Sequence, residues 1–191
     1  NYNGMLQNGK FYTWAQVTDS RNIAPVGWHV PSDSEWRTLT DYVDQNRGPS
    51  DSKAKALASK NGWNSSPNIG SPGNLPELNN YLGFSAIPLG GVSSPYYGND
   101  TPGSSARFFT STANNSTTAW AWGIEYQYQA FFRTVYNKTS QFSVRCVRDS
   151  GNSNMYAYDY DGNFYTAVTI GTQTWLVQNL GCNHYRNGDL I

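Results

Sequence analysis

The motif FSVRCVRD, at residues 142–149, decides which fold we expect. Its side chains alternate between two faces, with Phe142, Val144 and Cys146 on one and Ser143, Arg145 and Val147 on the other. A period of two is typical of a strand that buries one face. Upstream, a second alternation places Trp120, Trp122 and Ile124 opposite Ala121, Gly123 and Glu125. The pattern predicts two core strands within residues 110–149.

The segment between these strands, residues 127–140, is rich in Tyr, Phe, Asn and Gln and has little regular alternation. Such residues offer rigid contact area and adaptable hydrogen bonds at low entropic cost. We therefore expect the two strands to present an aromatic and amide surface. The rest of the chain would then be the scaffold that holds this surface.

The composition limits the function classes. A length of 191 residues suits a single domain spanning 1–191. The formal net charge is zero and only 14% of the residues are charged, so we expect no binding of nucleic acid or of anionic membrane. No apolar run approaches the ~20 residues of a membrane helix, so no membrane insertion is expected either. Abundant Gly, Asn, Ser and Tyr favour an extracellular, β-rich protein with long ordered loops.

One helix has a clear start signal. Ser32 and Glu35 have the spacing of a capping box, and Trp36, Leu39 and Val43 follow as an apolar stripe. We expect this helix to end near residues 46–49 and a second helical piece to span residues 51–59. Residues 10–17 alternate in the manner of a short strand.

The remaining segments divide into loops and strands. Residues 62–105 are punctuated by Gly, Pro, Ser and Asn, and a loop of this length in a compact domain is often functional. We expect residues 82–87 to anchor this loop in the core, and residues 106–111 to form a short strand. Near the C-terminus, two apolar runs flank Gly171 and Thr172, which is a good hairpin tip.

Several ordered motifs together resemble a known family, the Fibrobacter succinogenes major paralogous domain. The motifs are GWHVPSDSEW (27–36), GFSAIPLGG (83–91), FFTST (108–112), AW (119–120), FSVRCVRD (142–149) and DGNFYTAVTIGTQTWLVQNL (161–180). The resemblance implies exported, often lipoprotein-anchored proteins of the bacterial surface. It also implies an α+β, C-type-lectin-like fold with small antiparallel sheets, one or two helices and long ordered loops. Formylglycine-generating enzymes and hypervariable ligand-binding proteins share that fold.

The order of the motifs departs from the family. The segment at 161–180 opens the family's domain, whereas here it follows residues 142–149. The chain is therefore either a circular permutation or a cut through tandem copies. We expect residues 155–191 to complete the sheet by pairing antiparallel with residues 142–149 in a monomer. A swapped dimer or a fibre is the alternative.

Cys146 and Cys182 are the two cysteines of the chain. If the C-terminal segment docks as expected, it can bring them close enough for a disulfide. Two buried thiols are the alternative.

Signals for metal binding and catalysis are weak. Asp159, Asp161 and Asn163 have the spacing of calcium ligands, but an ordinary hairpin turn is the preferred interpretation, so no cofactor is expected. His29 and His184 are the only histidines, and we interpret them as structural and loop residues, respectively. We therefore expect no enzyme activity. An enzyme resembling the formylglycine-generating type is disfavoured because Cys146 lies in an apolar strand.

The remaining candidate is a ligand-binding surface over residues 114–137, with the loop at 96–100 as its rim. For Tyr126, Tyr128, Tyr136 and Asn137, a binding role and a packing role stay open. The expected ligand-binding residues are Tyr96, Tyr97, Asn114, Asn115, Ala121, Gly123, Glu125, Tyr126, Tyr128, Tyr136 and Asn137. We expect a non-catalytic, adhesin-like module that recognises an extracellular glycan or a surface protein. A structural module of a fimbria or surface layer is the other alternative.

Overall fold

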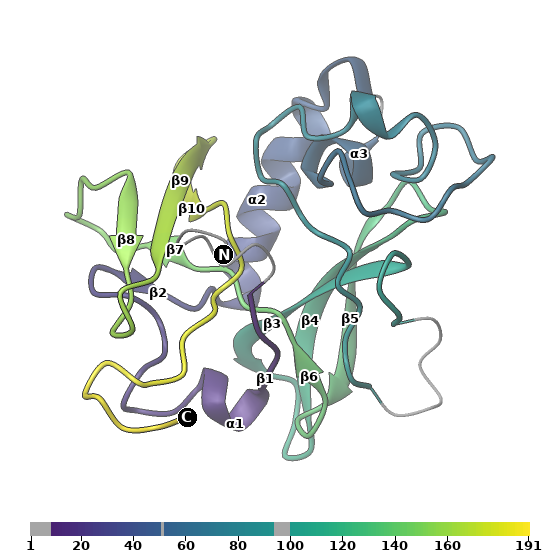
Figure 1. The fold of residues 1–191 in the computed structure, drawn as a ribbon. Coiled ribbons are helices and arrows are strands. Elements are labelled where there is room, and N and C mark those ends of the chain that lie inside the picture. The colour runs from purple at the N-terminus through teal and green to yellow at the C-terminus, as the bar shows by residue number, and fades with distance from the viewer. Residues whose placement is uncertain (1–8, 51, 94–99) are drawn as a thin grey trace, which may run out of the picture.

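The computed structural model describes residues 9–50, 52–93 and 100–191. Helix α2 (Asp33–Gln45) runs between a five-stranded sheet and a three-stranded sheet (Figure 1). The shorter helices are α1 (Trp14–Val17), α3 (Lys53–Leu57) and the 3₁₀ turns η1 (Gly48–Ser50) and η2 (Pro76–Leu78). All strand pairs in these sheets are antiparallel, so the fold is α+β with small antiparallel sheets.

The strands of the described residues form three sheets. The five-stranded sheet has the order β2 (Trp28–His29), β7 (Val147–Arg148), β10 (Gln173–Leu176), β9 (Phe164–Ile170) and β8 (Tyr156–Tyr158). The three-stranded sheet has the order β3 (Ser105–Ala113), β4 (Thr118–Glu125) and β5 (Phe131–Asn137). The smallest sheet pairs β1 (Tyr12–Thr13) with β6 (Gln141–Phe142). None of the helices in this described part is long and apolar enough to cross a membrane.

Helix α2 begins and ends where the sequence predicts. The Ser32 hydroxyl accepts a hydrogen bond from Glu35 N, and Glu35 Oε2 accepts one from Ser32 N at 2.8 Å. The stripe of Trp36, Leu39 and Val43 is completely buried, and Asn46 caps the C-terminal end. The capping box is therefore confirmed, because its partners lie only three residues apart.

The C-terminal segment joins the body of the chain as expected. Strand β10 pairs antiparallel with β7, with Trp175 opposite Val147. Strand β9 turns into β10 through Gly171, whose φ of 61° suits the two-residue hairpin, and Ile170 pairs with Gln173. In the described residues, three of the five strands of this sheet therefore come from residues 155–191.

The expectation that residues 142–147 form one strand with one buried face is wrong. Only β6 and β7 at its ends are strands, and every side chain from Phe142 to Val147 is buried. The reason is that the segment runs between two cores and is covered on both sides. Arg145, expected on the open face, is completely buried and donates hydrogen bonds to the carbonyl oxygens of Phe84, Ser85 and Leu176.

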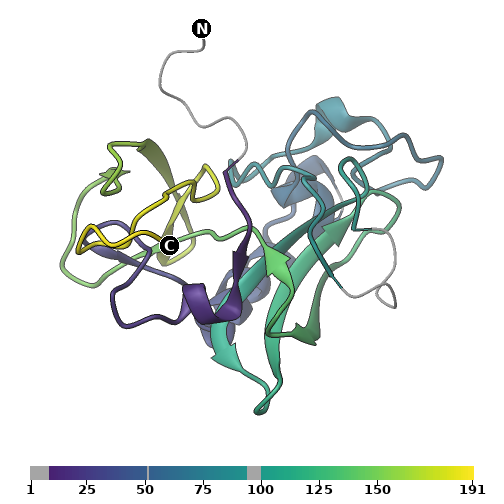
Figure 2. The same cartoon turned by 60° about the horizontal axis from the view of Figure 1, so that its bottom comes forward.

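Residues 10–17 also differ from the expected single strand. Strand β1 covers Tyr12 and Thr13, and the chain then turns into α1, which lies against the three-stranded sheet (Figure 2). Thr13 caps this helix by a capping box with Gln16, whose Oε1 accepts from Thr13 N at 2.8 Å. The Thr-x-x-Gln spacing is a capping-box signal for a helix, and it overrides the strand-like alternation of residues 10–17.

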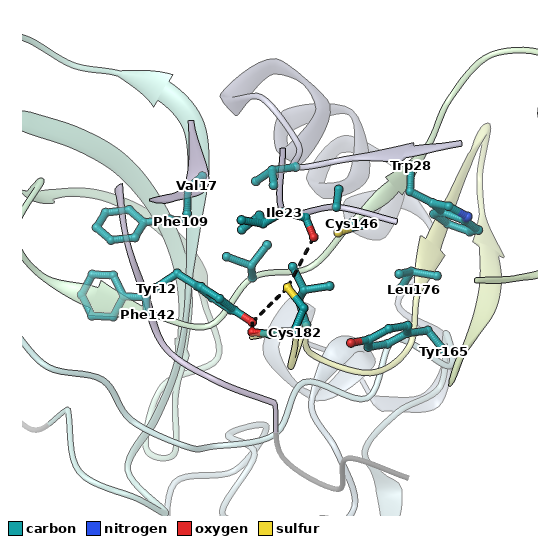
Figure 3. Packing of buried hydrophobic residues seen from close by; sticks show 14 of the residues in the cluster. Tyr12, Val17, Ile23, Trp28, Phe109, Phe142, Cys146, Tyr165, Leu176 and Cys182 are labelled. Carbon is teal, nitrogen blue, oxygen red and sulfur yellow. Dashed lines mark hydrogen bonds between the residues drawn. The ribbon is translucent and has the colours of Figure 1, made fainter. Parts of the chain in front are cut away.

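Two clusters of buried side chains form the interior. The tryptophan core surrounds α2 and is built from Trp36, Leu39, Val43, Phe84, Phe108, Trp122, Ile124, Phe131, Trp175 and their neighbours. The cysteine core joins the other face of the three-stranded sheet to the five-stranded sheet and contains Tyr12, Val17, Ile23, Trp28, Phe109, Phe142, Cys146, Tyr165, Leu176 and Cys182 (Figure 3). The three-stranded sheet is thus covered on both faces.

Of the two alternatives for the cysteines, the structure shows the buried thiols, because Cys146 and Cys182 are free and buried and form no disulfide. The Cys182 thiol instead donates to Ile23 O at 3.5 Å, and the Tyr12 hydroxyl donates to Cys182 O at 2.9 Å (Figure 3). These polar contacts satisfy the groups that the core encloses.

The long loop is anchored as the sequence predicts. Between α3 and β3, the described residues contain the turn η2 but no paired strand. Phe84 and Ala86 are completely buried, and Ala86 forms an isolated parallel bridge with Ala58. Residues 82–87 therefore hold the loop against the tryptophan core.

Candidate functional site

The predicted binding surface is divided between the two ends of the three-stranded sheet. Asn114 and Asn115 lie exposed in the β3–β4 turn, and Asn137 pairs with Thr118 at the same end. The remaining exposed candidates lie beyond the opposite end of β4. Eight strand residues at ~3.3 Å each separate the two ends by more than ~20 Å. These residues therefore do not form one site.

The other predicted residues have different surroundings. Ala121, Gly123 and Tyr136 are buried, whereas Tyr126 and Glu125 are partly exposed and Tyr128 is exposed. Tyr96 and Tyr97 lie outside the described residues.

Tyr136 and Glu125 belong to a network around the buried side chain of Arg107. Arg107 donates to the Tyr136 hydroxyl at 3.0 Å, and it forms ion pairs with Glu125 at 2.6 Å and with Asp100 at 3.0 Å. Burial raises the pKa of Tyr136. Of the two roles left open for Tyr136, the structure favours packing, because the residue is buried and its ring lies on Phe142 with centroids 4.6 Å apart.

The structure instead exposes a group of aromatic rings on the β8–β9 hairpin. We define this aromatic hairpin as Tyr156, Tyr158, Tyr160 and Phe164, which are 49%, 58%, 60% and 37% exposed. The ring centroids of Tyr156, Tyr158 and Phe164 lie 5.1–6.1 Å apart, so the three rings contact one another at the surface. Exposed aromatic rings that gather in this way are typical of binding surfaces.

Strand alternation explains why these rings face solvent. Tyr158 pairs with Phe164 across the ladder, which places both side chains on one face. The opposite face carries Ala157 and Tyr165, which are 5% and 0% exposed and pack in the cysteine core. One face of the hairpin therefore anchors it, and the other is left free.

The turn of the aromatic hairpin is held rigidly. Asp159 accepts hydrogen bonds from Asn163 N at 3.0 Å and from the Tyr165 hydroxyl at 2.6 Å. The Tyr165 hydroxyl also accepts a hydrogen bond from Gly181 N at 3.1 Å. Burial raises the pKa of Tyr165 above its usual value, so this hydroxyl keeps its proton at physiological pH.

A small polar pocket adjoins the rings. It has a volume of about 130 Å³, and its walls include Val26, Tyr158, Tyr160, His184 and Arg186. The Tyr160 and His184 rings lie 5.6 Å apart, and Asp161 contacts Nδ1 of His184. Apolar ring faces and polar donors therefore meet at one place.

The sequence itself carries a signal for this site. Tyr156, Tyr158 and Tyr160 alternate with Ala157 and Asp159, which is typical of a strand. Tyr156 and Tyr158 lie on one face of β8, the edge strand of the sheet, and Tyr160 follows in the turn, so the same residues also indicate an aromatic surface.

The residues with calcium-ligand spacing do not converge on a common point. Both oxygens of Asp159 accept hydrogen bonds from Asn163, and the Asp161 carboxylate contacts Asn183 N and His184. In the residues that the structure describes, no three His, Cys, Asp or Glu side chains are arranged to hold a metal ion.

His29 bridges two carboxylates away from the aromatic hairpin. Its Nδ1 lies 2.5 Å from Asp149 Oδ1, and its Nε2 lies 2.7 Å from Glu35 Oε1. The hydrogen bond with Glu35 and the one with Asp149 raise the pKa of His29, although burial opposes them. The three side chains connect β2, α2 and the end of β7.

Comparison with known proteins identifies the family. No curated protein and no solved structure matches the chain. The model of the Fibrobacter succinogenes major domain matches residues 1–148. The matched region extends from the N-terminus into β7, and the aromatic hairpin lies beyond it. Because this match covers more than half of the 191 residues, the protein belongs to the Fibrobacter succinogenes major domain family.

Proposed function

We propose that the chain is a non-catalytic, adhesin-like binding module of a bacterial cell-surface or secreted protein. The module recognises a glycan through the aromatic hairpin. The observation that carries this proposal is the group of four aromatic side chains, each more than one third exposed, on one rigid hairpin.

The chemistry of the hairpin supports a sugar as the ligand. Aromatic faces stack on the apolar faces of sugar rings, and the imidazole of His184 in the adjoining pocket can bond to a hydroxyl group. The Nε and Nη2 donors of Arg186 already bond to the carbonyl oxygens of Ala24, Pro25 and Trp28 and so hold the pocket wall. The low charge of the chain fits a ligand that is recognised by shape and hydrogen bonds. The alternative ligand of the aromatic hairpin is a protein, and the experiment below distinguishes a protein ligand from a glycan.

The protonation state of the two cysteines is an argument against the alternative function, an enzyme of the formylglycine-generating type. Burial raises the pKa of the Cys146 thiol above its usual value and that of Cys182 to about 11. Thiolates are the reactive species, and neither thiol is set up to ionise near neutral pH. This argument disfavours chemistry of the formylglycine-generating type.

We also propose the finer fold assignment and the permuted order. The small antiparallel sheets, helix α2 and the long loop are compatible with a C-type-lectin-like fold spanning residues 1–191. The segment at 161–180, which resembles the opening of the family's domain, pairs with β7 of the same chain. This pairing supports a circular permutation and a monomer.

The test compares two pairs of exposed tyrosines. Tyr158→Ala with Tyr160→Ala should abolish binding to a glycan array, because both rings line the pocket. Tyr42→Ala with Tyr128→Ala removes two exposed rings elsewhere and should leave binding unchanged. Both double variants should keep the melting temperature within a few degrees.

Two results would reject the proposal. One is equal glycan binding by the two double variants. The other is the absence of any glycan ligand while a surface protein binds the intact chain, because the ligand would then be a protein.

A further inference from the structure

A second cavity lies in the long loop, away from the aromatic hairpin. It has a volume of about 570 Å³ and lies between residues 59–62 and residues 80–87. Its walls include Ser59, Lys60, Asn61, Asn80, Ser85 and Ile87. Figure 1 shows the segment next to α3 and the strand β8 at different ends of the molecule. The cavity is therefore a separate site, which we call the loop pocket.

The backbone around the loop pocket is held by several hydrogen bonds. Ser59 N donates to Ala86 O at 2.8 Å, which joins the two walls. Ser59 O accepts from Trp63 Nε1 at 3.1 Å and from Asn79 Nδ2 at 2.9 Å. A pocket that is already formed loses little conformational entropy when a ligand binds.

Two residues of the pocket wall adopt a backbone conformation that L-amino acids rarely use. Asn80 has a φ of 67° and Ser85 a φ of 58°. The Asn80 side-chain oxygen accepts a hydrogen bond from Ser85 N at 2.7 Å, which connects the two strained positions. Backbone conformations of this kind are energetically unfavourable and gather at ligand sites.

The pocket is positively charged at its rim and behind its wall. Lys60, an exposed residue, is the one charged residue among the lining side chains. Behind the wall, the buried Arg145 guanidinium donates to Ser85 O at 2.8 Å and to Phe84 O at 2.7 Å. The hydrogen-bond partners that the structure shows for Arg145 are carbonyl and amide oxygens, so no contacting carboxylate offsets its charge.

The neutral groups of the pocket suit a sugar. The side-chain nitrogen of Asn80 and the hydroxyl of Ser85 have no hydrogen-bond partner in the part of the chain that the structure describes. Both can therefore bond to hydroxyl groups, and Ile87 offers an apolar contact to a ring. The volume exceeds that of a simple inorganic anion. Because Lys60 provides one positive charge at the rim, it matches a ligand with one carboxylate.

We propose that the loop pocket binds a saccharide that carries a carboxylate, that is, a uronic acid unit. Lys60 pairs with the carboxylate, and Asn80 and Ser85 bond to the ring hydroxyls. This site is independent of the aromatic hairpin, so either proposal can fail without the other.

The experiment uses the intact chain and two matched probes. One probe is a linear trimer of galacturonic acid, and the other is its methyl ester, which has the same hydroxyls without the charge. Isothermal titration calorimetry should show that the ester binds at least about tenfold more weakly than the acid. Binding of the acid should weaken as the salt concentration rises.

Three variants assign the binding to the pocket. Lys60→Ala should lower the affinity for the acid trimer about tenfold. Lys138→Ala is the control: it removes the same charge beside Trp14 and should leave this affinity unchanged. Ser85→Gly removes the hydroxyl at a position whose φ favours glycine, so affinity should fall while the melting temperature is kept. Tyr158→Ala with Tyr160→Ala should bind the acid trimer normally.

The proposal is overturned if the acid trimer shows no binding at millimolar concentrations, or if the ester binds as well as the acid. Equal effects of Lys60→Ala and Lys138→Ala would overturn it too. Loss of acid binding in the tyrosine variant would place the ligand on the aromatic hairpin and reject the loop pocket.

Discussion

Arg145 donates a 2.6 Å hydrogen bond from Nε to Oδ1 of Asn179, and both side chains are buried. The bond links the motif at 142–149 to the C-terminal segment. Burial lowers the pKa of the Arg145 guanidinium, and its planar set of donors satisfies four acceptors from two separate parts of the chain, residues 84–85 and 176–179. A guanidinium is suited to this role because its donors form a fixed fork.

Replacing Arg145 should therefore destabilise the whole fold. Arg145→Lys keeps the charge but leaves buried acceptors without donors, and each such group costs about 1–3 kcal/mol. We expect a loss of at least about 2 kcal/mol in the free energy of unfolding, measured in urea. Arg148→Lys, at a partly exposed side chain, is the control and should change stability by less than about 0.5 kcal/mol. Equal stabilities of the two variants would show that the Arg145 network is dispensable.

The His29 bridge should make stability depend on pH. Because the pKa of His29 is raised in the folded state, its stabilisation is fully present below the unfolded pKa of ~6.5 and is lost as the pH rises through the folded pKa. His29→Gln should therefore be less stable than the parent at pH 5.5 and nearly equal to it at pH 9. The side chains are about one third exposed, so the difference should not exceed about 1 kcal/mol.

An NMR titration of the His29 ring gives a direct check. The midpoint should lie above ~6.5 and should fall in Asp149→Asn, which removes one carboxylate. A midpoint at or below the ordinary value would contradict the bridge.

Glu35 should contribute to the stability of the fold in a different pH range from His29. Burial alone would raise its pKa, but hydrogen bonds from His29 and Ser32 lower the pKa of Glu35 to about 2. Its contribution is therefore present above the unfolded pKa of ~4.3 and is lost as the pH falls through about 2. Glu35→Gln should destabilise the protein at pH 6 more than at pH 2, as urea unfolding at the two pH values can show.

Two tyrosines that look alike in the sequence should respond differently to truncation. Tyr136→Ala removes a buried ring and the partner of Arg107, so it should cost about 3 kcal/mol or more. Tyr128→Ala removes a ring that is 52% exposed and should cost less than about 0.5 kcal/mol. Urea unfolding of both variants tests the pair. Similar losses would mean that the assignment of Tyr136 to the core is wrong.

Chelation should leave the fold unchanged. The Asp159 and Asp161 carboxylates already accept hydrogen bonds from protein groups, so the turn needs no calcium to hold its shape. The melting temperature should therefore be the same with EDTA and with added calcium. A drop in EDTA that calcium reverses would establish Asp159, Asp161 and Asn163 as ligands.

Truncation after Asp149 should give an unfolded or insoluble product. It removes Trp175, Tyr165 and Leu176, which are essentially inaccessible to solvent, and it exposes the edge of β7. Solution scattering of the intact chain should show a monomer at all concentrations. A soluble, cooperatively unfolding truncation product would show that residues 155–191 are not needed to complete this fold.

The elements that the sequence determined are those whose signals are local. Helix α2 could be predicted because Ser32 and Glu35 satisfy each other's backbone groups across three residues. The β9–β10 hairpin could be predicted because Gly171 supplies the turn between two apolar runs. In each case, the deciding atoms lie within one turn of the chain.

Only the tertiary structure decided which faces are covered. Arg145 is buried because segments about 30 and 60 residues away supply its acceptors, and no period along the chain reports them. For the same reason, Tyr136 packs in a core while Tyr158 faces solvent, although both stand in strands of antiparallel sheets. Alternation determines that two faces exist, but the packing of distant segments determines which of them becomes the surface.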